Sequence, residues 1–145
     1  MTPFRAQRAL RFGDCDPSGI AHFPAYFSLL VGVVEDFFAS IGAPWPTMIQ
    51  ERRMGVPTVK LDVTFSAPSM FGDTVDWELR VAKVGRSSLT LHHGISRSGT
   101  PLWNATQVLV ATTLNTNKST AWPDDIRAML NRHLNIFRDK SNQYG

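Results

Sequence analysis

Hydrophobic and polar residues alternate along three consecutive segments in the middle of the chain. These segments span residues 58–65, 75–81 and 88–96. Because successive side chains of a β-strand point to opposite faces of a sheet, a period of two predicts three strands, each with one buried face.

Turn-forming residues set the limits of the strands. Gly85-Arg86 and Ser98-Gly99 predict tight hairpin turns, and a fourth strand is expected from residue 102 to about 114. A first strand over residues 5–12 precedes a loop over residues 13–19 that is rich in Gly, Asp, Pro and Ser. Five antiparallel strands are therefore expected in all.

A long helix is predicted between the first strand and the other four. Pro24 suits its first turn, where a missing N–H costs nothing, and Gly42 followed by Pro44 ends it. Its apolar residues lie on nearly every side: Tyr26, Phe27, Leu29, Leu30, Val31, Val33, Val34, Phe37, Phe38 and Ile41. Such a helix must be covered on most faces.

Two further helices are predicted from their end signals. Thr47 and Gln50 have the spacing of a capping box, which predicts a short helix with Gly55 at its far end. Pro123 and Asp124 open a final amphipathic helix. Its apolar side carries Ile126, Met129, Leu130 and Leu134.

The order of these elements predicts an α+β fold. One strand, a central helix and four more antiparallel strands can form a sheet that wraps its apolar face around the helix. All 145 residues are expected to form one domain, with about residues 138–145 as a loose tail. The edge strands and the outer face of the sheet still need protection, so a homodimer or homotetramer is expected.

The charge of the chain favours an anionic ligand but no particular one. The formal net charge is +3 and the isoelectric point is near 9.4. The basic residues are scattered and lack the dense stripe with interleaved aromatics that is typical of a nucleic-acid groove, so no nucleic-acid partner is expected. Phosphorylated small molecules remain candidates.

Other sequence features indicate a cytoplasmic protein. The longest apolar run, residues 26–41, is shorter than a membrane span and contains Glu35 and Asp36, so no membrane insertion is expected. The first residues lack the apolar segment of a signal peptide. The single cysteine, Cys15, allows no disulfide framework, which is typical of a reducing compartment.

The pair Asp14-x-Asp16 is the most informative motif for chemistry. Asp14, Asp16, Ser18 and Gly19 copy the first half of a calcium loop, but Ala25 stands where a bidentate Glu is required. An Asp-x-Asp phosphatase would need a parallel sheet, which the alternating strands do not provide. A pair of turn-forming or helix-capping aspartates remains as a purely structural interpretation.

Residues 12–26, FGDCDPSGIAHFPAY, resemble the signature segment of the 4-hydroxybenzoyl-CoA thioesterase family. The matching positions are Asp14, Asp16, Gly19, Ile20 and Tyr26. Weaker similarity extends over most of the chain. The resemblance implies a hotdog fold, an antiparallel sheet wrapped around a long central helix, and hydrolysis of an acyl-CoA thioester to the free acid and CoA.

The resemblance implies that Asp16 acts on the thioester carbonyl as nucleophile or as general base toward water. Free N–H groups at the start of a buried helix can stabilise the oxyanion that develops. Because Pro24 cannot donate, the backbone amides of His22 and Phe23 are the expected donors. The His22 side chain is a further candidate for orienting water or substrate.

The resemblance also suggests substrate-binding residues. Tyr26 belongs to the signature, and Trp45 corresponds to a position that lines the aromatic acyl pocket, so an aromatic or short acyl group is expected. The phosphates of CoA need cations, and the family places them at the hairpin that here contains Arg86, Ser87 and Ser88. Coenzyme A enters as part of the substrate, and neither a separate cofactor nor a metal is expected.

Alternative functions remain open at this stage. A hydratase or dehydratase on the same fold would use a His with an acid, and its loop signature is only half met here. In a second group of hotdog thioesterases the nucleophile is a helix carboxylate, which would be Glu35. A non-catalytic acyl-CoA-binding protein is the third alternative.

Overall fold

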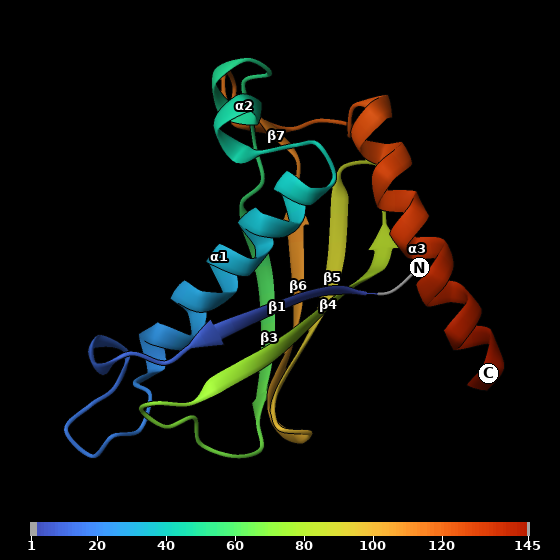
Figure 1. Ribbon diagram of the computed structural model, residues 1–145. Helices are drawn as coiled ribbons and strands as arrows, with labels where there is room; N and C mark the ends of the chain where they lie inside the picture. The colour runs from blue at the N-terminus through green and yellow to red at the C-terminus, as the bar shows by residue number, and fades with distance from the viewer. Residues whose placement is uncertain (1–2, 145) are drawn as a thin grey trace.

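A five-stranded antiparallel sheet curves around one long helix in the computed structural model of the protein (Figure 1). The structure describes the backbone of residues 3–144 and the side chains of residues 3–134. The main sheet has the strand order β1-β4-β5-β6-β3, and a small sheet has the order β2-β7-β8. The elements are β1 (Phe4–Ala9), η1 (Phe12–Asp14), α1 (Phe23–Ser40), α2 (Trp45–Gln50), β2 (Met54–Gly55), β3 (Thr58–Phe65), β4 (Thr74–Val84), β5 (Ser88–Arg97), β6 (Thr100–Val110), β7 (Thr112–Thr113), β8 (Lys118–Ser119) and α3 (Asp124–Tyr144).

The predicted alternation with one buried face is confirmed in β4 and β5 and separates the two faces of the sheet. In the edge strand β3 it is wrong, because Leu61 and Val63 are only partly buried and Val59 and Phe65 are exposed. In β4 every second residue from Val75 to Val81 is buried, and the residues between them are partly exposed. The same face continues across the registers Trp77↔Ile95 and Ile95↔Trp103. This apolar face packs against α1, whereas the opposite face carries polar and charged side chains.

Both predicted hairpin turns are present. Ser98 and Gly99 have φ values of 49° and 82°, the left-handed pair that a two-residue hairpin turn requires. At the other hairpin the Gly85 amide donates to the Ser88 carbonyl over 2.9 Å. The turns set the register in which β4, β5 and β6 pair.

Helix α1 forms the centre of the core, as its encircling apolar residues predict. Gly42 has φ +81° and its amide donates to the Ala39 carbonyl, which ends the helix at the predicted place. An ion pair between Arg8 on β1 and Asp36 ties the helix to the sheet. The side chains of Val33, Val34, Phe37 and Phe38 are at most 1% exposed.

The length and composition of α1 would also suit a membrane span. Among the described helices it is the one that passes this test, with a mean hydropathy of 1.3. Its most apolar side chains are nonetheless buried against the sheet. The helix therefore acts as the core helix of this fold, as expected from the sequence.

The predicted capping box of the short helix is wrong. Helix α2 begins at Trp45, two residues before Thr47, and no side chain caps it. Pro44 and Pro46 explain the earlier start, because their fixed φ angles suit a helix entrance and its first turn. Gly55 lies in β2 instead of closing the helix.

Two strand ends also differ from the prediction. Strand β1 ends at Ala9 because Phe12–Asp14 form a short 3-10 turn, in which the Asp14 carboxylate accepts the Arg11 amide over 2.8 Å. The fourth predicted strand splits after Val110, and its last residues pair with β2 and β8 in the small sheet.

Helix α3 closes the core beside the C-terminal half of α1. Ile126, Leu130 and Leu134 are buried, and the Phe37 and His133 rings lie 5.3 Å apart. An ion pair between Arg52 and Asp125 joins α2's end to α3. The predicted loose tail at about residues 138–145 lies outside the described side chains and stays a prediction.

A buried polar chain crosses the apolar face of the sheet. The Trp77 indole N–H donates to His93 Nδ1 over 2.9 Å, and His93 Nε2 lies 2.8 Å from Gln107 Oε1. The Gln107 amide then donates to the Thr58 hydroxyl over 2.9 Å. This pattern needs a neutral imidazole with its hydrogen on Nε2. Burial lowers the pKa of His93 to about 4.

We expect this histidine to weaken the fold in acid. His93 stays neutral in the folded state down to about pH 4, whereas in the unfolded chain it is protonated below its ordinary pKa of 6.5. The free energy of unfolding should therefore be highest above pH 6.5 and fall as the pH drops toward about 4. The loss is about 3 kcal/mol at most. Urea unfolding at pH 7 and pH 4.5 measures this loss of stability.

The variant His93→Gln keeps one donor and one acceptor, and it should lose less stability between the two pH values. The control His92→Gln, on the opposite face of the sheet, should show most of the loss seen in the unmodified protein. Equal losses for His93→Gln and the unmodified protein would contradict the assignment.

Candidate active site

The loop between η1 and α1 is folded tightly back on itself. The Asp16 amide donates to the Ile20 carbonyl, and the Gly19 amide donates to the Asp16 carbonyl, each over 2.9 Å. Gly19 has φ +84°, a conformation that other residues adopt only with strain. A bridge between Cys15 and Ala21 closes the loop at its base. Asp16 is thus presented on a short, hydrogen-bonded turn.

The Asp16 carboxylate is exposed and ionised. The Ser18 amide donates to Oδ1 over 2.8 Å, and the Ser18 hydroxyl donates to the same oxygen. These two bonds hold the pKa of the Asp16 carboxyl below its usual value, with smaller help from the Ile20 amide and His22. Asp16 therefore carries the negative charge that a nucleophile or general base needs.

Cys15 lies between the two aspartates, and its thiol favours the neutral form, whereas the Asp16 carboxyl favours the charged form. Partial desolvation, and then the charges of Asp14 and Asp16, raise the pKa of its thiol. A raised pKa disfavours the thiolate. Cys15 is therefore unsuited to act as the nucleophile of this loop.

The segment between β3 and β4 supports the Asp16 loop, a role that the sequence analysis missed. The Ala21 amide donates to the Ser69 carbonyl and the Phe71 amide donates to the Gly19 carbonyl, both over 2.7 Å. Asp73 holds this segment in place, because its carboxylate accepts the Met70 amide and pairs with Arg97. The only hint in the sequence was its Pro and Gly content, which signals a loop but not its neighbour.

The N-terminus of α1 follows directly after the loop. The His22 amide donates to the Asp14 carbonyl over 2.9 Å, so it is engaged. The Ala25 amide donates to the His22 carbonyl, and Pro24 has no N–H. Among the described residues, the Phe23 amide has no hydrogen-bond acceptor. Of the two expected oxyanion donors, Phe23 is therefore the one whose N–H is available within this chain.

A cleft of about 460 Å³ opens beside this helix end. Its lining is mostly apolar and consists of Ala21, Phe23, Tyr26, Phe65, Ser66, Ala67 and Pro68. The Tyr26 ring lies 4.9 Å from the Phe65 ring and 5.3 Å from the Trp103 ring, between centroids. The cleft therefore has aromatic walls next to the loop that carries Asp16. The sequence analysis anticipated Phe23 and Tyr26 here but not Phe65.

Known proteins resemble this chain in sequence and in fold. A family model described as the thioesterase-like superfamily matches residues 10–130. The chain belongs to this superfamily. The family resemblance noted in the sequence is thereby confirmed.

Two relatives and one solved structure illustrate the similarity. A 4-hydroxybenzoyl-CoA thioesterase from Pseudomonas sp. strain CBS-3 is 32% identical over 94 residues, which cover 63% of this chain and 67% of the relative. A 1,4-dihydroxy-2-naphthoyl-CoA hydrolase from Synechococcus elongatus is 23% identical over 131 residues, covering 90% of this chain and 96% of the relative. A 4-hydroxybenzoyl CoA thioesterase mutant complexed with 4-hydroxybenzoyl CoA superimposes with a TM-score of 0.82 at 23% identity, covering 90% of this chain and 99% of that structure. The predicted hotdog fold is confirmed.

The other expected site residues lie at the opposite end of the chain's fold. Trp45 packs near Phe38, at the end of α1 that is about 27 Å from the signature loop. Arg86, Ser87 and Ser88 form the hairpin beyond the far end of β4. The structure therefore brings Asp16, His22, Phe23 and Tyr26 together, but not with these four residues in one copy of the chain.

The hairpin itself is firmly held. Arg127 Nη2 donates to the carbonyls of Gly85 and Arg86, and the Trp122 indole donates to the Ser88 carbonyl over 3.0 Å. Arg86 itself is exposed. This end also contains a small cleft of about 140 Å³ lined by Trp45, Met48, Ile49, Met54, Gly55 and Val56.

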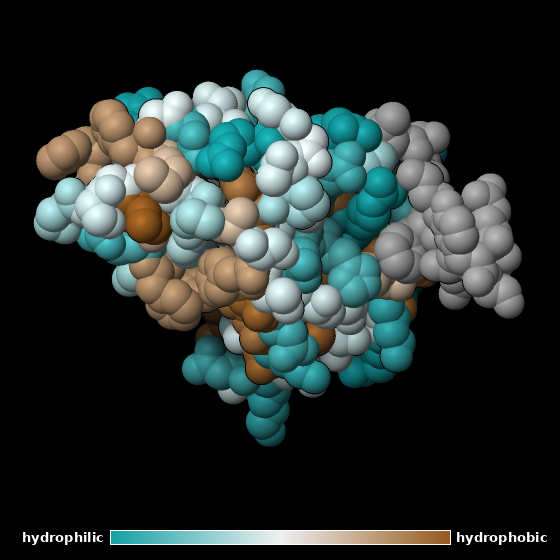
Figure 2. All heavy atoms as spheres, turned by 90° about the horizontal axis from the view of Figure 1, so that it is seen from below, coloured by the Kyte–Doolittle hydropathy of each residue, from teal (hydrophilic) through white to brown (hydrophobic). Residues whose placement is uncertain are grey.

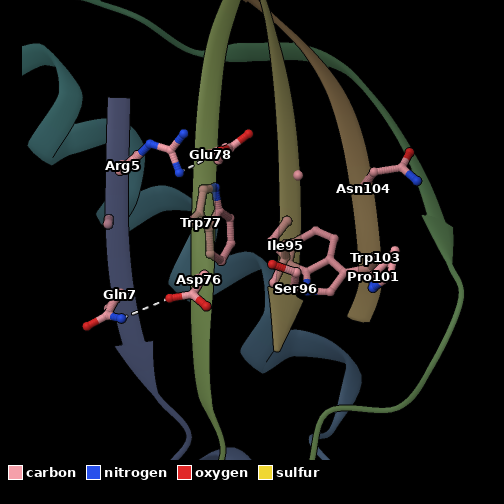
Figure 3. Close-up of a pocket in the computed structure, with 12 residues that line it drawn as sticks. Arg5, Gln7, Asp76, Trp77, Glu78, Ile95, Ser96, Pro101, Trp103 and Asn104 are labelled. Atoms are coloured by element: carbon pink, nitrogen blue, oxygen red, sulfur yellow. Dashed lines mark hydrogen bonds and ion pairs between the residues drawn. The ribbon is translucent and has the colours of Figure 1, made fainter. Parts of the chain in front are cut away.

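A larger hollow of about 740 Å³ lies on the polar face of the sheet, away from α1 (Figure 3). Gly94 leaves the space open, since a side chain there would meet no atom within 4 Å. Arg5 pairs with Glu78 over 2.8 Å, and Gln7 donates to Asp76 over 2.8 Å. The charged groups around the hollow are thus already paired, and none is poised for chemistry.

Proposed function

We propose that this protein hydrolyses CoA thioesters of aromatic acids, with Asp16 as nucleophile or general base. The observation that carries the proposal is one arrangement: an ionised Asp16 on a fixed turn, followed by an unengaged amide at the start of α1 and a cleft with aromatic walls. The thioesterase-like superfamily match supports the reaction class.

The chemistry follows from the charge of Asp16. As a nucleophile, the carboxylate adds to the thioester carbonyl, and the CoA thiolate leaves to give an acyl-aspartyl anhydride. Water then cleaves the anhydride, releasing the acid and restoring the carboxylate. As a general base, Asp16 instead takes a proton from the water that attacks. In both routes the oxyanion lies near the Phe23 amide and the positive end of α1.

The cleft favours an aromatic acyl group. Flat rings pack well edge-to-face or offset against aromatic walls, and here Phe23, Tyr26 and Phe65 provide such walls. The named relatives act on 4-hydroxybenzoyl-CoA and 1,4-dihydroxy-2-naphthoyl-CoA, which are both aryl thioesters. Both lines of support point to the same substrate class.

The complete site needs a second copy of the chain. Thr58 of β3 lies at the end of the sheet with the Arg86 hairpin, since the Val110 amide donates to Pro57 and the Ala111 amide donates to Ser87. Phe65 of the same strand lies at the opposite end, beside Tyr26. Two β3 edges related by a two-fold axis pair antiparallel. Such a homodimer places the Trp45 and Arg86 end of one copy against the Asp16 end of the other.

Exposed apolar side chains support this pairing. Phe23, Val59 and Phe65 are 62%, 62% and 44% exposed in the single chain. Figure 2 views the molecule from below the orientation of Figure 1 and shows hydrophobic residues gathered toward its left side. A tetramer built from such dimers is compatible with this arrangement. A cytoplasmic location stays a prediction.

Competing functions have weaker support. A hydratase would need a histidine positioned for proton transfer, but the ring of His22 already lies 3.2 Å from the Gly13 carbonyl. Glu35 is exposed in the middle of α1, away from the cleft beside Phe23. A measurement of turnover distinguishes a thioesterase from a non-catalytic acyl-CoA-binding protein.

We expect a panel of CoA esters to reveal aryl specificity. Thiol release from benzoyl-, 4-hydroxybenzoyl-, phenylacetyl-, butyryl- and palmitoyl-CoA should give a kcat/KM for the best aryl ester at least about tenfold above that for palmitoyl-CoA. Arg86→Ala should raise the Michaelis constant roughly two- to fivefold with kcat unchanged, and Arg132→Ala, an exposed cation on α3, should not. A clear preference for palmitoyl-CoA would overturn the aromatic cleft as the acyl site.

A further inference from the structure

Ser18 makes an unusual double contact with Asp16. Its amide and its hydroxyl both donate to Oδ1 of the carboxylate. The Ile20 amide makes a smaller contribution to the low pKa of this carboxyl. Within the described residues, Oδ1 accepts both Ser18 bonds and no hydrogen bond of normal geometry to Oδ2 is found. Ser18 is therefore the residue that makes the two oxygens of the carboxylate differ.

The backbone of the loop fixes this contact. Ser18 lies inside the turn closed by the Gly19 amide and the Asp16 carbonyl, and Gly19 adopts the left-handed conformation that returns the chain toward Ile20. The Phe71 amide holds the Gly19 carbonyl from the neighbouring segment. Ser18 thus has little freedom to move away from the carboxylate.

The turn itself needs only one of the two bonds. An aspartate that accepts the amide two residues later forms an Asx turn, and the Ser18 amide supplies this bond over 2.8 Å. The hydroxyl bond is additional. It restrains rotation of the carboxylate without being required for the shape of the loop.

We propose that Ser18 is a positioning residue that reserves Oδ1 of Asp16 for its own hydrogen bonds and leaves Oδ2 as the oxygen that reacts. This inference rests on the proposed function. A carboxylate attacks a carbonyl, or takes a proton from water, with one oxygen at a time. Holding Oδ1 therefore reduces the number of orientations in which Asp16 can face the thioester.

The same contact tunes the charge of Asp16. Donors to a carboxylate favour its ionised form, so the reactive group is ready over a wider pH range toward acid. The donors also make the carboxylate a weaker base. The hydroxyl raises the rate only if fixing the orientation of the carboxylate speeds the reaction more than the lower basicity slows it. A variant without the hydroxyl measures the net effect.

The test compares Ser18→Ala, which keeps the amide bond and removes the hydroxyl, with Ser18→Thr, which keeps both. In Ser18→Ala we expect kcat for the best aryl-CoA to fall roughly ten- to a hundredfold and the acid limb of the pH–kcat/KM profile to move to higher pH. Ser18→Thr should restore both toward the unmodified protein. Ser119→Ala, an exposed serine of β8, controls for a general effect of losing a hydroxyl.

A carbon-13 NMR titration of the Asp16 carboxyl reads the contact without turnover. A higher pKa in Ser18→Ala supports the contact even if no thioester is hydrolysed, in which case the proposed function fails and the contact stands. Unchanged NMR pKa, kcat and acid limb in Ser18→Ala would overturn the inference. A fall in kcat that Ser18→Thr does not restore, with an unmoved acid limb, would also overturn it.

Discussion

Asp16→Asn should lower kcat/KM for aryl-CoA hydrolysis by at least about 1,000-fold while leaving the fold intact. Asparagine has the same shape and still offers an oxygen to the Ser18 donors, so the loop should keep its hydrogen bonds. It lacks the charge that attacks the carbonyl or accepts a proton from water. Thiol-release kinetics measure the loss, and thermal unfolding should show a midpoint within about 4 °C of the unmodified protein.

Two matched carboxylates test whether the effect is specific. The Asp14 side chain accepts the Arg11 amide and shapes η1, so Asp14→Asn should cost only a few-fold in activity. Glu35 is exposed on α1, and Glu35→Gln should be milder still. A larger loss for Glu35→Gln than for Asp16→Asn, at equal stability, would show that the nucleophile has been misassigned.

The parts of the fold that were predictable depend on local chemistry. Alternation along residues 75–81 predicted β4 because every second side chain of this strand is buried against the core. Ser98-Gly99 predicted a hairpin because few residue pairs adopt two left-handed conformations in succession. Gly42 predicted the end of α1 for the same conformational reason.

Features set by distant partners were not predictable in this way. The residues after Val110 continue the apolar pattern of β6, yet they leave the main sheet because β2 offers them a different partner. The capping-box pattern at Thr47 predicted the wrong helix start. The helix begins earlier because Pro44 and Pro46, on either side of Trp45, have fixed φ angles that suit a helix entrance. Neither outcome can be predicted from the local sequence pattern alone, because each depends on a second segment that favours a different structure.

The candidate site likewise contains residues that the sequence predicted and residues that it did not. The family signature placed Asp16, Phe23 and Tyr26 in one neighbourhood because they are close in sequence and separated only by a tight turn. Phe65 and Ser69 reach the same neighbourhood through the return of the chain after β3, which the sequence pattern does not reveal. The engagement of the His22 amide by Asp14 also depends on how the loop closes.

Val59→Lys should convert the protein to a monomer and reduce hydrolysis by more than about tenfold. Val59 is 62% exposed on the free edge strand β3, where the pairing of two copies would bury it. A buried lysine without a partner is costly, and charged edge residues oppose strand pairing. Without the second copy, the Arg86 end is no longer beside Asp16. Light scattering should change from a multiple of 16.2 kDa to that mass itself.

Val31→Lys is the matched control, because Val31 is 50% exposed on α1 and lies off the strand edge. The same substitution there should leave both the mass and the turnover largely unchanged. Dissociation by Val31→Lys but not by Val59→Lys would move the interface from the edge of β3 to the outer side of α1. A protein that is monomeric before any substitution and fully active would show that one copy of the chain contains the whole site, so that Trp45 and Arg86 would have no place in it.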